Sequence, residues 1–551
     1  MTKILTALAK DLIKLSPQTG DDLALVKRRL AKKYKIPLPT NATLIGELKR
    51  LNHKDDLLFK LLKRRLVRTL SGIAPVAVLT SPWPCPGRCA YCPTDKNIPQ
   101  SYLANEPAVM RAVYCDFNPY KQVIYRLRAL EANGHEPTKI ELIVIGGTWS
   151  ALPETYQYWY IKECFRAANN FSRNPQLATR NAATKGLPLL KKELAKEQKR
   201  NETAKYQLIG ITLETRPDYI NDKELWRMRE FGATRVELGV QALDDKILKL
   251  NRRGSTVADI KRASKLLKDF GFKTTYHFMP ALPGSSPAHD RQMFQAMFSP
   301  DRDTSTIQLT GAQTPKLKKL IAQKLNNNDF NPDQIKFYPT VVTKGSLLYK
   351  WWRAGKYKPY TDEQLKKLII SCKQIIPPFV RIIRLIRDIP GESIMAGNKI
   401  TNLRQIMKQQ GVACRCIRCR EVGQSKFKLN QAKLFVKKYR ASDGDEYFIS
   451  FEDEEQTKLY GFARLRLADN SIFPQTAWLR ELHVYGELVS VGKNSTKTQH
   501  QGLGRLLVSQ AETIARLANY RQLAIISGVG VRGYYKKLGY RLFKTYLIKA
   551  L

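Results

Sequence analysis

The sequence lacks a long apolar run and an export signal. No uninterrupted apolar stretch in its 551 residues approaches the roughly 20 residues that a membrane-spanning helix requires. Lys10 and Asp11 interrupt the first segment, where a secretory signal would need an apolar core. We therefore expect a cytoplasmic protein without a membrane partner.

Acidic residues are scarce relative to basic ones. The chain holds 48 Asp and Glu against 94 Lys and Arg, which gives a formal net charge of +46. A surplus of this size favours a polyanionic partner, with nucleic acid first and an anionic membrane surface second. With 43% hydrophobic residues the chain can bury substantial cores, and its length favours two or more domains.

The nine cysteines are clustered and do not suggest a disulfide framework. They form two triplets and the isolated Cys115, Cys164 and Cys372, which favours metal ligation in a reducing compartment. The first triplet is Cys85, Cys89 and Cys92, in the pattern C-x3-C-x2-C. Structural zinc would need a fourth ligand, and no further Cys or His lies nearby. Three thiolates on a 4Fe-4S cluster leave one iron open to S-adenosylmethionine, so this triplet predicts a radical generator.

The second triplet, Cys414, Cys416 and Cys419, predicts zinc ligation. It supplies three ligands, so a remote fourth is required. Cys372 is one candidate by elimination, and a histidine or water is the alternative. Because no catalytic acid or base flanks the triplet, we expect a structural site that joins two domains.

The first 70 residues predict a basic helical region. Leucines recur at helical spacing, for example at Leu5, Leu8 and Leu12. The polar faces carry many basic and few acidic residues, which favours contact with nucleic-acid phosphates over a merely solvated surface.

Six β-rich segments alternate with helical stretches between residues 71 and 345. They are 76–80, 140–145, 208–213, 235–240, 274–278 and 335–338. This alternation predicts an α/β fold with a partial (β/α)6 barrel, whose active site lies at the carboxyl ends of the strands. The first cysteine triplet follows the first strand, as such a site requires. The stretch 169–205, rich in Asn, Lys and Ala, predicts a surface excursion.

Small and polar residues at the predicted strand ends are candidates for binding S-adenosylmethionine: Gly146, Gly147, Glu214, Arg216 and Gln241. The glycines would let backbone carbonyls approach the methionine amino group, although a simple turn is the alternative. The polar side chains would bind ribose hydroxyls or the methionine carboxylate, with an ion pair between Glu214 and Arg216 as an equal alternative. His277 and the turn 280–284 end the fifth strand, where backbone groups would frame the adenine. His277 itself is either a packed core residue or a catalytic one.

Residues 346–430 form a connecting region with the second triplet, and residues 431–551 predict a mixed α/β domain. In the latter, a strand at 478–485 precedes the glycine turn Gln499–Gly504. Glycines there expose backbone N–H groups at a helix amino terminus, which bind the pyrophosphate of a coenzyme. Tyr534 and Tyr535 lie on the helix after the next strand. This order is similar to that of the Gcn5-related acetyltransferases, which bind acetyl-coenzyme A.

Taken together, the motifs resemble the catalytic subunit family of Elongator, in a prokaryotic form, over nearly the whole chain. The resemblance rests on the first triplet with Asn105–Arg111, and on the segments Phe337–Thr340, Arg387–Pro390, Arg418–Gly423, Glu481–Gly486, His500–Gly502 and Ile526–Gly530. The resemblance implies a radical S-adenosylmethionine barrel followed by an acetyltransferase-like domain, with a 4Fe-4S cluster, acetyl-coenzyme A and zinc. Eukaryotic members space the first two cysteines more widely and lack the second triplet, so the zinc assignment rests on prokaryotic relatives and the thiols themselves.

The resemblance also implies which residues bind acetyl-coenzyme A and which are catalytic. The residues that match acetyl-coenzyme A contacts in the family are Lys139, Glu481, Leu482, His483, Val484, Leu503, Gly504, Arg505 and Tyr535. Gly502 of the glycine turn is added to this set. Tyr534, Tyr535 and Lys139 are the predicted catalytic residues.

The implied activity is the addition of an acetyl-derived carboxymethyl group to C5 of the wobble uridine of tRNA. A radical from S-adenosylmethionine would take a methyl hydrogen from acetyl-coenzyme A, and the acetyl radical would add to C5, which is too weak a nucleophile to attack a thioester. The expected partners are tRNA, acetyl-coenzyme A and an unidentified electron donor, and a homodimer is left open. The loop 491–498 is predicted to cover the coenzyme until tRNA arrives.

Two rival functions fit parts of the sequence. A protein lysine acetyltransferase with a structural cluster explains the carboxyl-terminal domain but leaves the open iron unused. A nucleic-acid-binding scaffold without catalysis explains only the charge.

Overall fold

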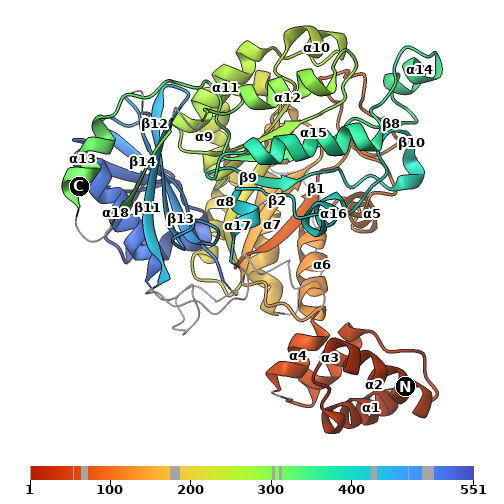
Figure 1. Ribbon diagram of the computed structural model, residues 1–551. Coiled ribbons are helices and arrows are strands. Elements are labelled where there is room, and N and C mark those ends of the chain that lie inside the picture. Colours follow the sequence, from red (N-terminus) through yellow and green to blue (C-terminus); the bar gives the residue numbers. More distant parts are fainter. Residues whose placement is uncertain are drawn as a thin grey trace.

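Two large sheets, a small two-stranded sheet and a separate helical bundle make up the described structure (Figure 1). It is a computed structural model that describes residues 2–53, 55–63, 72–173, 186–300, 304–309, 313–422, 431–469, 471–486 and 502–551. Along the chain the bundle comes first, a parallel sheet follows, and a mostly antiparallel sheet comes last. In Figure 1 the bundle lies beyond one end of α6 (Pro119–Ala132), away from the second sheet. No helix within the described ranges combines the length and the hydropathy that crossing a bilayer demands.

The bundle confirms the predicted helical amino-terminal region. Its helices are α1 (Thr2–Leu15), α2 (Gly20–Lys33), α3 (Asn41–Arg50) and α4 (Asp56–Leu62). The side-chain oxygens of Thr19 and Thr40 accept backbone N–H groups and so begin α2 and α3. Apolar residues of the four helices, among them Leu12, Leu30 and Leu44, form a core of their own. This core leaves the basic polar faces free to meet a partner.

The first sheet has seven parallel strands in chain order. They are β1 (Ala74–Leu79), β2 (Lys139–Ile145), β3 (Gln207–Thr215), β4 (Arg235–Gln241), β5 (Lys273–Phe278), β7 (Gln334–Phe337) and β9 (Arg381–Arg384). The predicted partial barrel is confirmed, with one strand more than expected. The extra strand, β9, comes from the connecting region, and its four residues are too few to show a period in the sequence.

Helices accompany this sheet between its strands. They are α5 (Pro107–Tyr114), α6, α7 (Glu154–Asn170), α8 (Leu187–Asn201), α9 (Asp222–Glu230), α10 (Asp245–Leu250), α11 (Val257–Asp269), α12 (Pro287–Ala296) and α15 (Asp362–Ile375). Helix α8 corrects part of the predicted excursion at 169–205. Its Leu190 and Leu194, one helical turn apart, are buried as α8 packs on α7. Residues 174–185 of the excursion lie outside the described residues.

The second sheet has eight strands in the order β16-β17-β15-β14-β13-β12-β11-β6. They are β6 (Thr304–Leu309), β11 (Lys433–Ala441), β12 (Gly444–Glu452), β13 (Leu459–Leu467), β14 (Thr476–Val484), β15 (Gln522–Ile525), β16 (Arg541–Phe543) and β17 (Tyr546–Ala550). Strands β14 and β15 are parallel, and the other neighbours are antiparallel. With α13 (Thr314–Ala322), α18 (Leu503–Leu517) and α19 (Arg532–Lys536), this is the predicted mixed α/β domain.

The connecting region contains regular structure beyond β9. Strand β10 (Ile394–Ala396) pairs with β8 (Val342–Thr343). The region also contains the helices α14 (Leu347–Arg353), α16 (Leu403–Gln409) and α17 (Ile417–Arg420). The domain limits 1–70, 71–345, 346–430 and 431–551 stay predictions. Strand β6 shows that the chain crosses between the sheets, because it leaves the barrel segment to join the second sheet.

A buried charge network fastens the second sheet to the amino-terminal edge of the first. Asp333, just before β7, accepts hydrogen bonds from Arg480 of β14 at 2.6 and 3.0 Å and from the N–H group of Thr274 at 2.9 Å. Arg480 also pairs with Glu446 of β12 at 3.0 Å. Asp333, Glu446 and Arg480 are all buried, so these charges satisfy one another instead of meeting water.

Candidate active site

The first cysteine triplet lies in the loop after β1, at the carboxyl edge of the parallel sheet. Cys85, Cys89 and Cys92 are free thiols and line one cavity of about 770 Å³. The N–H group of Gly87 donates to the sulfur of Cys85 at 3.4 Å. The N–H group of Ala90 donates to the carbonyl of Asn251 at 3.0 Å, which ties the loop to the segment after α10.

The predicted glycine pair lies at the end of β2, beside this cavity. Gly146 and Gly147 have φ angles of 134° and 96°, which favour glycine. A Cβ on Gly146 would come within 2.0 Å of Thr80 Oγ1, and that hydroxyl donates to the Gly146 carbonyl at 3.4 Å. Gly147 lines the cavity itself. The pair is therefore a turn that brings backbone to the cavity wall.

Glu214, Arg216 and Gln241 also line the cavity. The alternative of a Glu214–Arg216 ion pair is wrong, because Arg216 pairs with Asp218 through Nε at 3.0 Å and Nη2 at 2.9 Å. Its Nη1 is buried without a hydrogen-bond partner in the described part of the chain. Gln241 has a left-handed φ of 70°, and its buried Oε1 likewise has no partner there.

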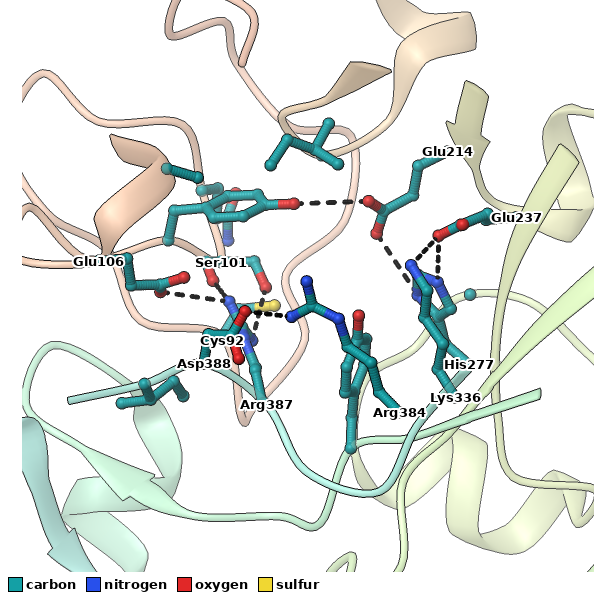
Figure 2. A pocket seen from close by; sticks show the side chains of 18 of the residues that line it. Cys92, Ser101, Glu106, Glu214, Glu237, His277, Lys336, Arg384, Arg387 and Asp388 are labelled. Atoms are coloured by element: carbon teal, nitrogen blue, oxygen red, sulfur yellow. Dashed lines mark hydrogen bonds and ion pairs between the residues drawn. The ribbon is translucent and has the colours of Figure 1, made fainter. Parts of the chain in front are cut away.

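A charged network lines the same cavity inside the barrel, as Figure 2 shows. His277 of β5 lies between two carboxylates, with Nε2 2.8 Å from Glu237 Oε2 and Nδ1 3.5 Å from Glu214 Oε1. Lys336 of β7 also pairs with Glu237. Burial would raise the pKa of Glu237, but Lys336 and His277 hold it well below its usual range. His277 is thus buried like a core residue and also faces the cavity like a site residue, so neither of the two expectations alone describes it.

Two segments that carried the resemblance meet beside Cys92 (Figure 2). Arg387 Nη1 donates to Ser101 Oγ at 3.2 Å, and its Nη2 donates to the Ser101 carbonyl. The same guanidinium lies 3.6 Å from Glu106. The segment after β9 thereby closes over the cysteine loop.

The residues predicted to contact acetyl-coenzyme A lie at the other edge of the barrel and on the second sheet. Lys139 begins β2, and burial lowers its pKa to about 8. Glu481 of β14 pairs with Lys273, the first residue of β5, at 3.3 Å and with Arg464 at 2.9 Å. Burial would raise the pKa of Glu481, but these two cations lower it to about 2, so the carboxylate is ionised.

The glycine turn opens α18 as predicted. Gly502 has a φ of 82° immediately before the helix. A Cβ on Gly504 would come within 2.8 Å of the Tyr534 hydroxyl, so this tyrosine lies against the start of α18. Tyr535 is buried with its ring 5.1 Å from that of Tyr534, and burial raises the pKa of both. The neighbouring candidates on β14 and α18 are Leu482, His483, Val484, Leu503 and Arg505. Gln499, His500 and the loop 491–498 lie outside the described residues.

The second triplet is a compact group of thiols. The sulfurs of Cys414, Cys416 and Cys419 lie within 4.8 Å of one another. Cys372, one candidate for the fourth ligand beside a histidine or water, is not part of this group. Burial raises the pKa of the Cys372 thiol, whose charged neighbours are on α12, whereas Lys373 Nζ reaches Cys419 Sγ at 3.8 Å. Adjacent residues of a helix project about 100° apart, so only one of the two can face the triplet.

The residues at the carboxyl edge fit a 4Fe-4S cluster with S-adenosylmethionine. Three unpaired thiols face one cavity, and iron–sulfur clusters are held by thiolates. The loop also needs a glycine at 87, since a Cβ there would come within 2.3 Å of Arg216 Nη1. The unpartnered polar atoms of Arg216 and Gln241 are those that a bound ligand would satisfy.

Comparison with known families supports this division of the chain. Models of the Radical SAM superfamily, the Radical_SAM C-terminal domain and the Acetyltransferase (GNAT) family match residues 85–297, 332–410 and 417–540. The chain is 42% identical to the tRNA uridine(34) acetyltransferase of Dehalococcoides mccartyi (strain CBDB1), over 89% of this chain and 100% of that protein. It is 35% identical to Elongator complex protein 3 of Homo sapiens, over 98% of this chain and 96% of that protein.

The chain belongs to the Elongator complex protein 3 family. A solved structure of archaeal Methanocaldococcus infernus Elp3, with an amino-terminal deletion, superposes with a TM-score of 0.69 at 36% identity, covering 88% of this chain and all of that one. The predicted family and fold class are therefore confirmed. As a radical SAM enzyme of this family, the chain has a domain that uses an iron–sulfur cluster and S-adenosylmethionine, joined to an acetyltransferase domain.

Proposed function

We propose that this enzyme attaches a carboxymethyl group, derived from acetyl-coenzyme A, to C5 of the wobble uridine of tRNA. The observation that carries the proposal is the meeting of the first cysteine triplet with Gly147, Glu214, Arg216 and Gln241 in one cavity. The same chain carries an acetyltransferase domain, and relatives that match 89% and 96% of it are named for uridine 34 of tRNA. An ordinary acetyltransferase has no use for a radical site, whereas functionalising an unactivated methyl group needs one.

The carboxyl edge of the barrel would hold the radical-forming group. Cys85, Cys89 and Cys92 would bind the 4Fe-4S cluster, which with S-adenosylmethionine supplies a 5′-deoxyadenosyl radical. The backbone of Gly147 and the unpartnered atoms of Arg216 and Gln241 would bind the polar groups of the sulfonium cofactor.

The second sheet would bind acetyl-coenzyme A. Backbone N–H groups at the start of α18, next to Gly502 and Gly504, suit a pyrophosphate. The ionised Glu481 fixes Lys273 at the barrel edge. Lys139, whose pKa of about 8 lies near neutrality, and the paired Tyr534 and Tyr535 are the proposed acid–base residues for the thioester.

The basic bundle would grip tRNA while the target base enters the cavity. Base-modifying enzymes take the base out of its stack, so the RNA has to be held beside the site. The net charge of +46 and the basic last turns of α2 and α3 suit phosphates. A structural zinc at Cys414, Cys416 and Cys419 completes the proposal. A cytoplasmic location, an external electron donor and a homodimer stay predictions.

The deciding experiment compares Cys89→Ala with Cys115→Ala, a buried free cysteine outside the cavity lining. Each anaerobically reconstituted protein receives S-adenosylmethionine, acetyl-coenzyme A, a reductant and unmodified tRNA, and the anticodon nucleosides are analysed by mass spectrometry. We expect carboxymethylated uridine from the wild type and Cys115→Ala and none from Cys89→Ala. Transfer of acetyl groups to a lysine peptide by wild type and Cys89→Ala alike, with no change in tRNA, would favour the lysine acetyltransferase instead.

A further inference from the structure

A buried arginine contacts the cysteine loop from a segment that neither the motifs nor the proposed reaction uses. Arg253 follows α10 and is 7% exposed. Its Nη1 donates to the sulfur of Cys89 at 3.7 Å, and its Nη2 donates to the carbonyl of Gly239 at 2.5 Å. The guanidinium therefore lies between the wall of the barrel and one of the three cluster-binding sulfurs.

The surrounding backbone is shaped to place this guanidinium. A Cβ on Gly239 would come within 2.5 Å of Arg253 Nη2, so only glycine leaves room for it on β4. Gly254, the next residue, has a left-handed φ of 75° that turns the chain away. Two residues earlier, Asn251 accepts the N–H group of Ala90 from the cysteine loop. The position of Arg253 relative to Cys89 is thus held from both sides.

The buried charge of Arg253 differs from the charges of Arg216 and Arg387, each of which lies beside a carboxylate. Arg216 pairs with Asp218 at 2.9 Å, and Arg387 lies 3.6 Å from Glu106. Within the described ranges, Arg253 forms no ion pair with an acid. It brings a net positive charge into a buried site, where charges act more strongly than in water.

We infer that Arg253 sets the reduction potential of the iron–sulfur cluster at Cys85, Cys89 and Cys92, by stabilising its reduced state. Reduction adds one electron to a cluster that already carries the negative charge of its thiolates. A cation at a ligand sulfur lowers the energy of that added charge, and hydrogen bonds to sulfur act in the same direction. Arg253 is a positioning residue in this account, because it acts through Cys89.

The test is a redox titration, read by the electron paramagnetic resonance of the reduced cluster, without tRNA or acetyl-coenzyme A. Arg253→Gln keeps an amide donor but removes the charge, Arg253→Lys keeps the charge, and Arg252→Gln changes the exposed neighbour. At the wild-type midpoint we expect the reduced-to-oxidised ratio of Arg253→Gln to fall about tenfold, which is about 59 mV for one electron. Arg253→Lys should stay closer to the wild type, and Arg252→Gln should match it.

Iron and sulfide content per chain is measured first in every variant. A fully loaded Arg253→Gln cluster with the wild-type midpoint overturns the inference. So does loss of iron from Arg253→Gln and from Arg253→Met, since the arginine would then hold the loop and not set the potential. Because the readout is a potential, this result is independent of whether the enzyme modifies tRNA.

Discussion

Replacing Asp333 by Asn should destabilise the protein more than almost any single change of charge. Asn keeps the size of the side chain but removes the negative charge that faces Arg480 at 2.6 Å and Arg464 at 3.6 Å. Both arginines are buried, so neither can turn to water. Glu446 and Glu481 still contact the two arginines, but the buried network is left with excess positive charge. Removing one partner of a buried ion pair costs about 3–5 kcal/mol.

That loss can be measured as a shift in thermal unfolding. For domains of about 150–250 residues, 1 kcal/mol moves Tm by about 2–4 °C, so Asp333→Asn should lower it by roughly 6–20 °C. Asp329→Asn is the matched control, because Asp329 and its partner Lys261 are both nearly half exposed. An exposed pair contributes about 0–1 kcal/mol, so its Tm should hardly move. Equal Tm values for the two variants in calorimetry would refute the role of this network.

The dependence on pH has a defined sign. Burial would raise the pKa of Asp333, but Arg480, Lys268 and Arg464 hold it far below the ordinary 3.8. The stability that this carboxylate contributes is therefore fully present above pH 3.8 and is lost as the pH falls further. The Tm difference between wild type and Asp333→Asn should be constant near neutrality and shrink only in acid.

Three further predictions concern the proposed sites. Thioester hydrolysis, followed as thiol release, should rise as the pH passes 8, where Lys139 becomes neutral, and Lys139→Arg should abolish that rise. The methyl group of Gly504→Ala would meet the Tyr534 hydroxyl, so this variant should bind acetyl-coenzyme A roughly tenfold more weakly, which is about 1.4 kcal/mol in titration calorimetry. Gly533→Ala, where a methyl group has open space around it, should bind the coenzyme as the wild type does. Metal analysis should find that Cys416→Ser has lost its zinc and that Cys372→Ser has kept it. Loss of zinc from Cys372→Ser would identify Cys372 as a ligand.

Local patterns in the sequence predicted the elements of the fold well. The first strands, the cysteine loop and the helix at α18 each rest on a few neighbouring residues, so periodicity and glycine placement reveal them. Strand β9 is too short for such a pattern, and β6 joins a sheet whose other strands follow more than 120 residues later in the chain. Their places depend on tertiary packing, which a local pattern does not contain.

The candidate site was predictable only where its members belong to a motif. Glu237, His277 and Lys336 come from three strands and meet only when the barrel forms. The one signal for Glu237 was an acid between Val236 and Leu238 in a short strand. Arg253 had no signal at all, because its partner Cys89 is 164 positions away. Which of the neighbours Cys372 and Lys373 faces the second triplet depends on how their helix packs, and in the structure Lys373 reaches Cys419.

In the proposed enzyme, one reaction joins the barrel cavity to the acetyltransferase domain. The most direct measurement uses acetyl-coenzyme A with a deuterated methyl group, together with S-adenosylmethionine, reductant and tRNA. We predict that the 5′-deoxyadenosine released by the wild type gains deuterium, and that Cys89→Ala releases none. Deoxyadenosine that stays free of deuterium while uridine is modified would contradict the account.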